Sequence, residues 1–438
     1  MVSNLSSPVV LRKDQSMDDA ALDPTLTARA QAYGMPLEAI NPAHPELFRS
    51  GGFWPYFERL RAEDPVHWAV SPAPEIGGYW SVTRYNDIVA VDSDHESFSS
   101  EPVIVLPDPD PDFRLPMFIA MDPPRHDVQR KTITPSVSGP NLAHLAPIIR
   151  ERAGQILDEL PIGEEFDWVD KVSIELTTMT LATLLDFPWA DRRKLTRWSD
   201  VATAPPDSHL FEPGRGVEQR KGELFECLAY FVQLWNERVN APPRPDLISM
   251  LAHGEATRNM DRMEYLGNLI LLIVGGNDTT RNTITGSVLA LAENPEQDAR
   301  LRADAALIPA MVSETIRWQT PLAYMRRTAT RDVELGGKLI RQGDKVAMWY
   351  ISGNRDEAMI ERPDEFWIER PRVRQHLSFG FGIHRCVGKR LAELQLQIIW
   401  EEILKRFPVI EVTGPPSRVY SSFVHGYEQL PVVIPRRP

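Results

Sequence analysis

Apolar and charged residues alternate with helical spacing through much of the middle of the chain. In residues 142–160 and 220–239, apolar side chains recur every three or four positions with charged ones between them, which predicts helices that pack by one face. A longer apolar pattern spans residues 263–293. Short strand-like runs occur at 78–83 and 333–349, where Gly336-Gly337 and Gly343-Asp344 predict turns. The pattern predicts a mainly α fold with small β-sheets.

Proline-rich, acidic stretches interrupt the helical pattern at residues 102–111 and 204–213. Proline at this density favours surface loops, and we expect these two loops to cover a site. No internal repeat or linker-like shift in composition marks a domain boundary. We therefore expect a mobile N-terminal arm over residues 1–24 and a single domain over residues 25–438.

Composition narrows the class of protein. Apolar residues make up 42% of the 438 residues and charged residues 25%, which is typical of a globular protein with a large core. A net charge of −13 disfavours a protein that coats nucleic acid or an anionic membrane. The longest apolar run, residues 269–274, is far shorter than the ~20 residues that span a bilayer. With two cysteines and no signal-peptide pattern, we expect a reducing, cytoplasmic location.

Cys386 lies where a glycine-rich loop, residues 377–388, meets a helical pattern that continues to Phe407. Helix N-terminal amides favour a thiolate, the form of cysteine that binds metals. Gly382 and Gly388 leave room for a flat macrocycle, and a single thiolate suits haem better than zinc, which usually takes four ligands. The alternative is a buried structural cysteine. Cys227, in an amphipathic run, is interpreted in that way.

Residues 379–388 read Phe-Gly-Phe-Gly-Ile-His-Arg-Cys-Val-Gly and resemble the haem-binding signature of the cytochrome P450 superfamily. The match includes Phe379, Gly382, His384, Cys386 and Gly388, and the resemblance extends over the chain from about residue 53 onward. It implies the single-domain, triangular-prism fold of that superfamily. It also implies haem b, with Cys386 as the axial iron ligand, and a monooxygenase reaction with O2.

Other basic and acidic residues match family positions. Glu314 and Arg317, three residues apart, share a helix face; such pairs are common on helix surfaces, but this one resembles the family's Glu-x-x-Arg pair, completed by Arg370 or Arg355. Partly buried haem propionates need cationic partners. By resemblance the propionate-binding residues are His126, Arg130, His384 and Arg327, with the adjacent Arg326 as an alternative to Arg327. Without the resemblance, His126 and Arg130 would indicate only a solvated helix face.

Residues 275–280 read Gly-Gly-Asn-Asp-Thr-Thr in the middle of the long apolar pattern. Each glycine costs a helix interior ~1 kcal/mol relative to alanine, so we expect a functional kink there. The segment resembles the family's acid–alcohol motif, which implies that Gly276 lies beside the haem, that Thr279 binds the oxygen and that Asp278 gates its protons. The alternatives are a buried or capping carboxylate and a helix-kinking hydroxyl.

Residues 275–286, 317–323, 325–329 and 348–356 resemble most closely the soluble bacterial alkane and fatty-acid terminal hydroxylases. The resemblance implies oxidation of the terminal methyl of a medium-chain n-alkane or related linear chain. A primary C–H bond is stronger than its neighbours, so terminal selectivity requires a channel that presents only the chain end. By position we expect, as residues lining it, Val274, Gly275, Leu322, Ala323, Met325, Phe423 and Val424, for which ordinary core packing is the alternative.

No flavin or iron–sulfur motif is present in the chain, so we expect electrons from NAD(P)H to arrive through a separate [2Fe-2S] ferredoxin and its reductase. The candidate basic docking face consists of Arg125, Arg372, Arg374, Lys389 and Arg390. One rival function is a non-enzymatic haem-thiolate sensor or carrier, which the Asp278-Thr279 pair disfavours. Another keeps the fold but acts on a bulkier terpenoid, sterol or macrolide.

Overall fold

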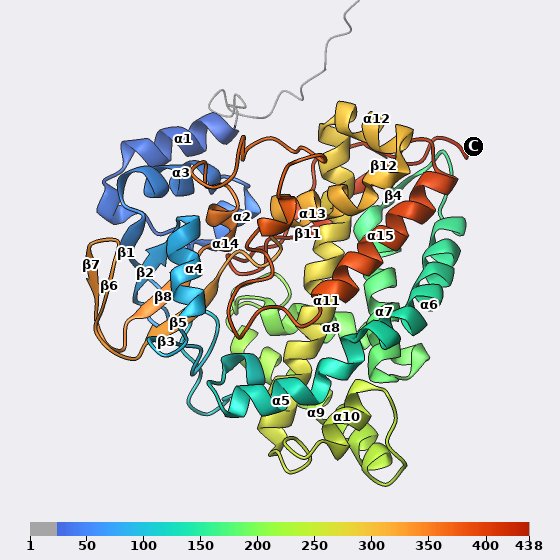
Figure 1. Cartoon of the computed structure of the whole chain (residues 1–438), viewed down its shortest axis with the longest axis horizontal. Coiled ribbons are helices and arrows are strands. Elements are labelled where there is room, and N and C mark those ends of the chain that lie inside the picture. The colour runs from blue at the N-terminus through green and yellow to red at the C-terminus, as the bar shows by residue number, and fades with distance from the viewer. Residues whose placement is uncertain (1–23, 438) are drawn as a thin grey trace, which may run out of the picture.

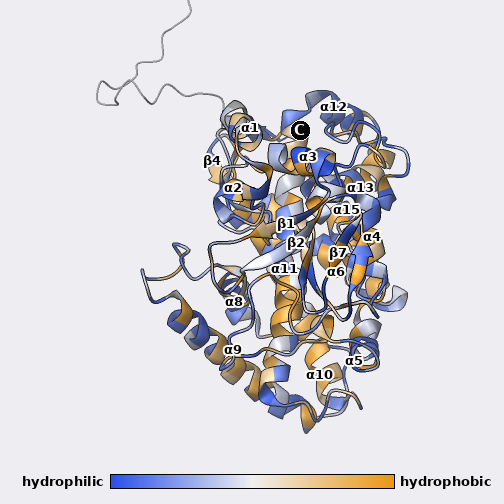
Figure 2. Ribbon diagram, turned by 90° about the vertical axis from the view of Figure 1, so that its left-hand side faces the viewer, coloured by the Kyte–Doolittle hydropathy of each residue, from blue (hydrophilic) through white to orange (hydrophobic). Residues whose placement is uncertain are grey.

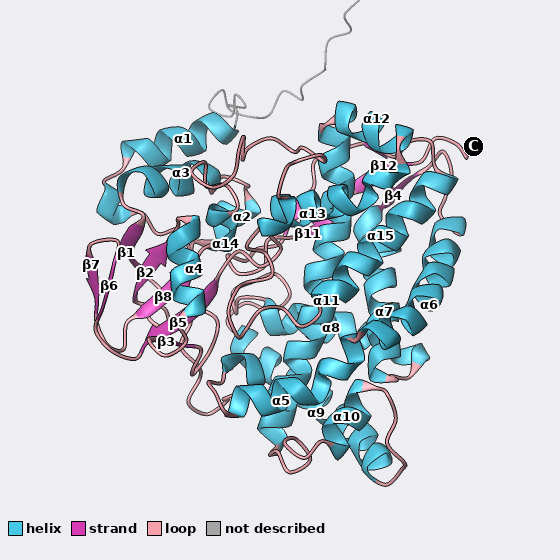
Figure 3. Cartoon of the chain, viewed as in Figure 1, coloured by secondary structure: helices cyan, strands magenta, loops and turns pink. Residues whose placement is uncertain are grey.

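The computed structural model describes residues 24–437. Helices dominate it (Figure 3). They are α1 (Pro24–Gly34), α2 (Pro45–Arg49), α3 (Trp54–Glu63), α4 (Tyr85–Ser93), α5 (Arg125–Ile133), α6 (Gly139–Asp158), α7 (Glu175–Leu185), α8 (Arg193–Thr203), α9 (Gly216–Val239), α10 (Leu247–His253), α11 (Arg262–Glu293), α12 (Pro295–Ala303), α13 (Ile308–Gln319), α14 (Tyr350–Gly353) and α15 (Lys389–Arg406). The helices predicted from the apolar patterns are confirmed as α6, α9 and α11. Nearly all of the expected N-terminal arm, residues 1–23, lies outside the described residues.

The strands form small sheets beside the helices (Figure 1). The largest has the order β1-β2-β8-β5-β3, with β1 at Val66–Val70, β2 at Gly78–Val82, β8 at Lys345–Met348, β5 at Met325–Ala329 and β3 at Phe98–Ser99. A second sheet joins β4 (Glu165–Asp167), β12 (Pro431–Val433) and β9 (Glu411–Val412), and two hairpins join β6 (Val333–Leu335) to β7 (Lys338–Ile340) and β10 (Ser417–Arg418) to β11 (Tyr427–Gln429). Strands β1 and β2 pair antiparallel with Trp68 opposite Trp80, whereas β2 and β8 run parallel.

The predicted turns of the strand region occur where glycine permits them. Gly336 and Gly337, at φ of 57° and 74°, connect β6 to β7, and Gly343, at φ of 90°, precedes β8. Side chains other than glycine rarely adopt these left-handed conformations. The expectation of a mainly helical protein with small sheets is therefore confirmed, and the two predicted strand-like runs contain β2 and β6 to β8.

The long helix α11 forms the centre of the main core. Its residues pack against α7, α8, α9, α13 and α15, and hydrophobic residues are concentrated along it in the interior of the view in Figure 2. Across this core, the indole N–H of Trp400 on α15 donates to the Ser287 hydroxyl on α11 at 2.8 Å. None of the helices in residues 24–437 is both long enough and apolar enough to cross a bilayer.

Candidate active site

A tight loop presents Cys386 to the interior just before α15 begins. The backbone N–H of Cys386 donates to the carbonyl oxygen of Phe379 at 2.8 Å, and Gly380 and Gly382 adopt φ of 66° and 61°. A Cβ atom on Gly382 would lie 2.4 Å from the carbonyl oxygen of Asp92. Glycine is therefore required at position 382 both by its backbone conformation and by the contact with α4.

The Cys386 thiol lies where several donors stabilise its anion. Burial raises the pKa of Cys386 above its ordinary value, and hydrogen bonding by the Gly388 and Lys389 backbones and the charge of Arg130 offset only part of this shift. Backbone donors and a cation beside a cysteine sulfur are the surroundings that stabilise a metal-bound thiolate. Cys227 differs, because it is fully buried and burial raises the pKa of its thiol with no cation opposing the shift. The interpretation of Cys227 as a packing residue agrees with this burial.

A cavity of about 1390 Å³ opens in front of Cys386. Most of the proposed site residues line it, namely Arg130, Val274, Gly275, Gly276, Thr279, Leu322, Met325, Arg327, Phe379, His384, Cys386, Gly388 and Phe423. Both proline-rich loops contribute as well, through residues 103–105, 107–111 and 204–207. The expectation that these loops cover a site therefore agrees with their position in the structure.

Two positions proposed for the cavity wall lie elsewhere. Ala323 is fully buried and packs with Tyr324 and Trp349 in a separate core cluster. Val424 is 1% exposed, at the β-bridge that pairs it with Leu322. Neither lines the cavity, so the assignment of these two residues is corrected to core packing. Their neighbours Leu322 and Phe423 do reach the cavity.

Buried nitrogen atoms without partners lie at the edge of the cavity near Cys386. The imidazoles of His126 and His384 are 4.3 Å apart in an edge-to-face arrangement. Within residues 24–437, Nε2 of His126 and both ring nitrogens of His384 have no hydrogen-bond partner. Arg130, close by, donates to the carbonyl oxygen of Arg385. Because buried polar atoms are normally satisfied, these groups fit a bound molecule with acidic oxygens, as a haem with its propionates would supply.

Arg326 and Arg327, neighbours on β5, extend in different directions. The Arg326 side chain donates to the Leu106 carbonyl at 3.1 Å and to Asp108 at 3.0 Å, whereas Arg327 lines the cavity and pairs with Asp92 at 2.6 Å. Successive residues of a strand point to opposite faces, which explains the divergence. Of the two arginines, the geometry brings Arg327 to the site.

Asp92 on α4 was not among the residues predicted from the sequence. Its carboxylate accepts hydrogen bonds from Arg327, from the Tyr350 hydroxyl at 2.8 Å and from the backbone N–H of Phe381 at 2.7 Å. It thereby connects a cavity arginine to the loop that carries Cys386. An isolated aspartate in an amphipathic helix gives no sequence signal for this role.

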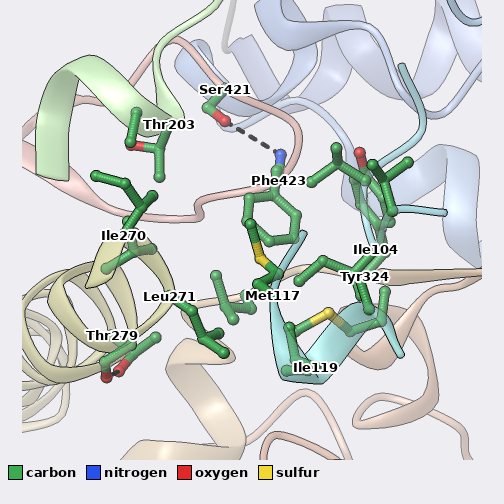
Figure 4. A pocket seen from close by; sticks show the side chains of 18 of the residues that line it. Ile104, Met117, Ile119, Thr203, Ile270, Leu271, Thr279, Tyr324, Ser421 and Phe423 are labelled. Carbon is green, nitrogen blue, oxygen red and sulfur yellow. Dashed lines mark hydrogen bonds between the residues drawn. The ribbon is translucent and has the colours of Figure 1, made fainter. Parts of the chain in front are cut away.

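Asp278 and Thr279 are adjacent on α11 but have different surroundings. Thr279 lines the cavity, and its hydroxyl donates to the Gly275 carbonyl at 2.9 Å (Figure 4). Asp278 is fully buried, 3.0 Å from Arg281, and its Oδ2 lies 3.4 Å from the Thr203 hydroxyl of α8. Helix α11 is continuous through the glycine pair. The expected kink therefore does not break the helix.

The ion network around Asp278 reaches α8. Arg281 also pairs with Asp200 of α8, at 2.5 Å. Burial raises the pKa of Asp278 to about 6, the charge of Asp200 adds to the shift, and Arg281 opposes it. An acid with this pKa exchanges protons near neutral pH.

Glu314 is the centre of a second, fully buried ion network. Its carboxylate pairs with Arg317 at 2.7 Å and with Arg370 at 3.0 Å, and accepts the backbone N–H of Trp367 at 2.9 Å. Arg355, the alternative to Arg370, instead stacks over the Trp318 ring with its guanidinium carbon 3.6 Å from the centroid. The structure thus brings Arg370, rather than Arg355, to the pair.

Comparisons with known proteins agree with this geometry. The family model described as "Cytochrome P450" matches residues 212–426. The linalool 8-monooxygenase of Pseudomonas putida is 35% identical over 91% of this chain and 99% of the relative. The methyl-branched lipid omega-hydroxylase of Mycobacterium tuberculosis (strain ATCC 25618 / H37Rv) is 32% identical over 86% and 90%.

Solved structures extend the likeness to three dimensions. CYP153D17 from Sphingomonas sp. PAMC 26605 is 50% identical with a TM-score of 0.84, and covers 90% of this chain and 98% of that one. Cytochrome P450-153 from Novosphingobium aromaticivorans is 46% identical with a TM-score of 0.83 and the same coverages. Membership implies haem with a cysteine thiolate ligand and electrons from redox partners. The chain belongs to the cytochrome P450 family and is a monooxygenase.

Proposed function

We propose that this monooxygenase hydroxylates the terminal methyl group of a linear hydrocarbon chain. The observation that carries the proposal is the cavity, whose wall combines the Cys386 thiol and the Thr279 hydroxyl with many aliphatic side chains. Figure 4 shows Ile104, Met117, Ile119, Ile270 and Leu271 among them. An apolar chain gains ~25 cal/mol per Å² of surface that it buries there.

Two comparisons support attack at a chain end. The Mycobacterium tuberculosis relative is an omega-hydroxylase of methyl-branched lipids, and the sequence resembles the alkane and fatty-acid terminal hydroxylases. Terminal selectivity requires that the wall hold the chain so that its end, rather than the weaker internal C–H bonds, approaches the reacting centre. Val274, Gly275, Leu322, Met325 and Phe423 are the residues that we assign to this part of the wall.

The residues around Cys386 would hold the haem. The thiolate of Cys386 would bind the iron, and Arg130 and Arg327 would neutralise the propionates. His126 and His384, whose pKa values burial lowers, would donate hydrogen bonds to the propionates as neutral imidazoles. Gly276, Gly382 and Gly388 would leave room for the ring, and Phe379 would pack against it. Haem bound in this way supplies the chemistry that activates dioxygen. The Glu314, Arg317 and Arg370 network would fix the surrounding core.

Asp278 and Thr279 are the residues that we assign to proton delivery. The Thr279 hydroxyl faces the cavity, and among residues 24–437 the Gly275 carbonyl is its one hydrogen-bond acceptor, so it can turn to donate to a molecule in the cavity. Asp278 faces α8 and, with its raised pKa, can take up and release protons from that side. The adjacent pair thus connects the protein interior to the cavity.

Electrons would enter from a ferredoxin on the side of α15. Arg372, Arg374 and Arg390 are exposed and form no ion pair within residues 24–437. Arg125, by contrast, is engaged with Glu264 at 2.6 Å, so it is the least available member of the proposed docking face. An acidic ferredoxin would be guided to such a surface by long-range attraction.

Optical titration with octane, dodecanoic acid and a sterol, followed by product analysis, tests the proposed function. A linear chain is expected to cause the low-spin to high-spin shift and to yield the terminal alcohol. The second candidate, oxidation of a terpenoid, is favoured by the 35% identity to a linalool 8-monooxygenase. Linalool in the same assay decides between them: terpenoid turnover without terminal oxidation of either linear chain would contradict our proposal.

A further inference from the structure

Arg220, on the first turns of α9, places a guanidinium at the cavity wall, and no carboxylate within residues 24–437 pairs with it. It lines the cavity together with Val217 and Leu224 of the same helix. Its hydrogen bond within residues 24–437 goes to the carbonyl oxygen of Ala202 in the last turn of α8. One carbonyl leaves most of the N–H donors of a guanidinium without a protein acceptor.

The other lysine and arginine side chains that line the cavity each have a carboxylate partner or a place beside the haem position. Lys221 pairs with Asp110 at 2.5 Å, and Arg327 pairs with Asp92 at 2.6 Å. Arg130 lies among the residues that surround the haem position. Arg220 is the remaining cation, and neither a protein carboxylate nor the haem explains it.

The acidic residues of the wall do not neutralise Arg220. Asp108 already pairs with two other cations, and Glu75 and Asp207 are exposed. The Asp207 carboxylate accepts from the Tyr420 hydroxyl at 3.5 Å. Burial lowers the pKa of Arg220, with no nearby acid opposing the shift, as expected of a cation that lacks a counter-ion.

The packing of α8 against α9 fixes the position of this guanidinium. A Cβ atom on Gly216, the first residue of α9, would lie 1.8 Å from the carbonyl oxygen of Pro206. The backbone of the loop after α8 therefore touches the start of α9 directly. In Figure 4 the end of α8, with Thr203, lies beside the cavity above Ile270 and Thr279 of α11.

We propose that Arg220 binds the anionic end of a linear substrate, so that this enzyme selects chains with a terminal carboxylate over neutral alkanes. The inference rests on the proposed terminal hydroxylation and names its substrate class. A carboxylate would accept the free guanidinium donors in a partly desolvated site, where such charge-assisted bonds are strong. The apolar tail would extend along the aliphatic wall, with its methyl end toward Thr279 and Cys386.

The test compares dodecanoate, methyl dodecanoate and dodecane by the spin-state shift in haem-loaded wild type and Arg220→Gln. Wild type is expected to bind dodecanoate more tightly than its ester. In Arg220→Gln the affinity for dodecanoate is expected to fall about ten-fold or more, with the ester and dodecane changed less than about two-fold. Arg220→Lys is expected to restore part of the preference. Lys221→Gln, which removes a cation already paired, is the matched control and is expected to keep it.

Equal weakening of all three ligands in Arg220→Gln would show that Arg220 only ties α9 to α8, and would overturn the inference. A wild type that binds the ester as tightly as dodecanoate would overturn it too. Product analysis with dodecane separates this inference from the proposed function. If wild type forms dodecan-1-ol but shows no carboxylate preference, the assignment of Arg220 alone fails; if it oxidises no linear chain, both proposals fail.

Discussion

The Nε atom of Arg370 lies 3.0 Å from Oε2 of Glu314, although 56 residues separate the two in the sequence. Both side chains are buried, and Arg317 occupies the other side of the same carboxylate. A buried charge without a partner of opposite sign costs several kcal/mol of folding free energy. Burial of these three charged side chains is therefore tolerated only while the carboxylate pairs with both guanidiniums. The triad therefore makes the core around α13 dependent on a single carboxylate.

Replacing Glu314 by Gln is expected to destabilise the protein by about 3–5 kcal/mol, because two buried guanidiniums lose their counter-ion. Urea unfolding and the fraction of protein that retains haem measure this effect. Glu365→Gln is the matched control, since its pair with Arg362 is 57% exposed on the glutamate side and contributes less than about 1 kcal/mol. Equal stability of the two variants would contradict the structural role of the triad.

Thr279→Ala is expected to keep substrate binding but to divert electrons to peroxide. The variant lacks the hydroxyl that faces the cavity, so product formed per NAD(P)H should fall about ten-fold while peroxide rises. Thr283→Ala is the control, because the Thr283 hydroxyl makes a similar bond one turn further on, to the Thr279 carbonyl at 2.7 Å. Unchanged coupling of electrons to product in Thr279→Ala would remove Thr279 from the proposed proton path.

The raised pKa of Asp278 predicts that the turnover rate changes with pH around that pKa, as one limb of the pH–rate profile. A carboxyl whose pKa is about 6 is mostly protonated below that pH and loses its proton above it. If the protonated form is what delivers protons, the rate falls as the pH rises through about 6. Asp278→Asn is expected to abolish this limb and to slow turnover about 100-fold.

Asp200→Asn tests the cause of that limb without touching the acid itself. The charge of Asp200 helps to raise the pKa of Asp278, so its removal should shift the limb to lower pH. The pH dependence of the turnover rate, measured with saturating redox partner, reports the shift. A limb that stays in place in Asp200→Asn, or one that survives in Asp278→Asn, would assign the titration to another group.

Turnover with a ferredoxin is expected to fall steeply as ionic strength rises, because screening weakens attraction to the exposed arginines. Replacing Arg372 and Arg374 with glutamine should slow electron transfer at low salt and flatten the salt response. Substrate binding by the spin-state shift should stay unchanged. The same salt response in the variant and in wild type would place the docking surface elsewhere.

Periodic sequence patterns predicted the fold class and several long elements because burial repeats along a helix or strand. The patterns predicted α6, α9 and α11, and the glycine turns predicted the β6–β7 hairpin. The Cys386 loop could be predicted because its chemistry is local, with the ligand, the glycines and the following helix in one stretch. Its backbone conformation then follows from Gly380 and Gly382, because glycine adopts the left-handed geometry without steric cost.

The remaining features depend on how distant segments meet. The choice between Arg370 and Arg355 depends on which side chain the loop after α14 brings to Glu314, and the choice between Arg326 and Arg327 depends on which face of β5 turns inward. Asp92 and Arg220 gave no signal at all, because an isolated charge in an amphipathic helix is usually solvated. The prediction that Ala323 and Val424 line the cavity was wrong for the same reason. Being next in sequence to a residue of the cavity wall does not decide which way a side chain points.

The central claim is that Cys386 supplies a thiolate to haem iron, and the spectrum of the reduced, carbon-monoxide-treated protein tests it most directly. Wild type and Cys227→Ser are both expected to show the band diagnostic of thiolate ligation, because Cys227 is only a packing residue. Cys386→Ser is expected to lose that band together with turnover. A wild type without the band, or a Cys386→Ser variant that retains it, would contradict the account.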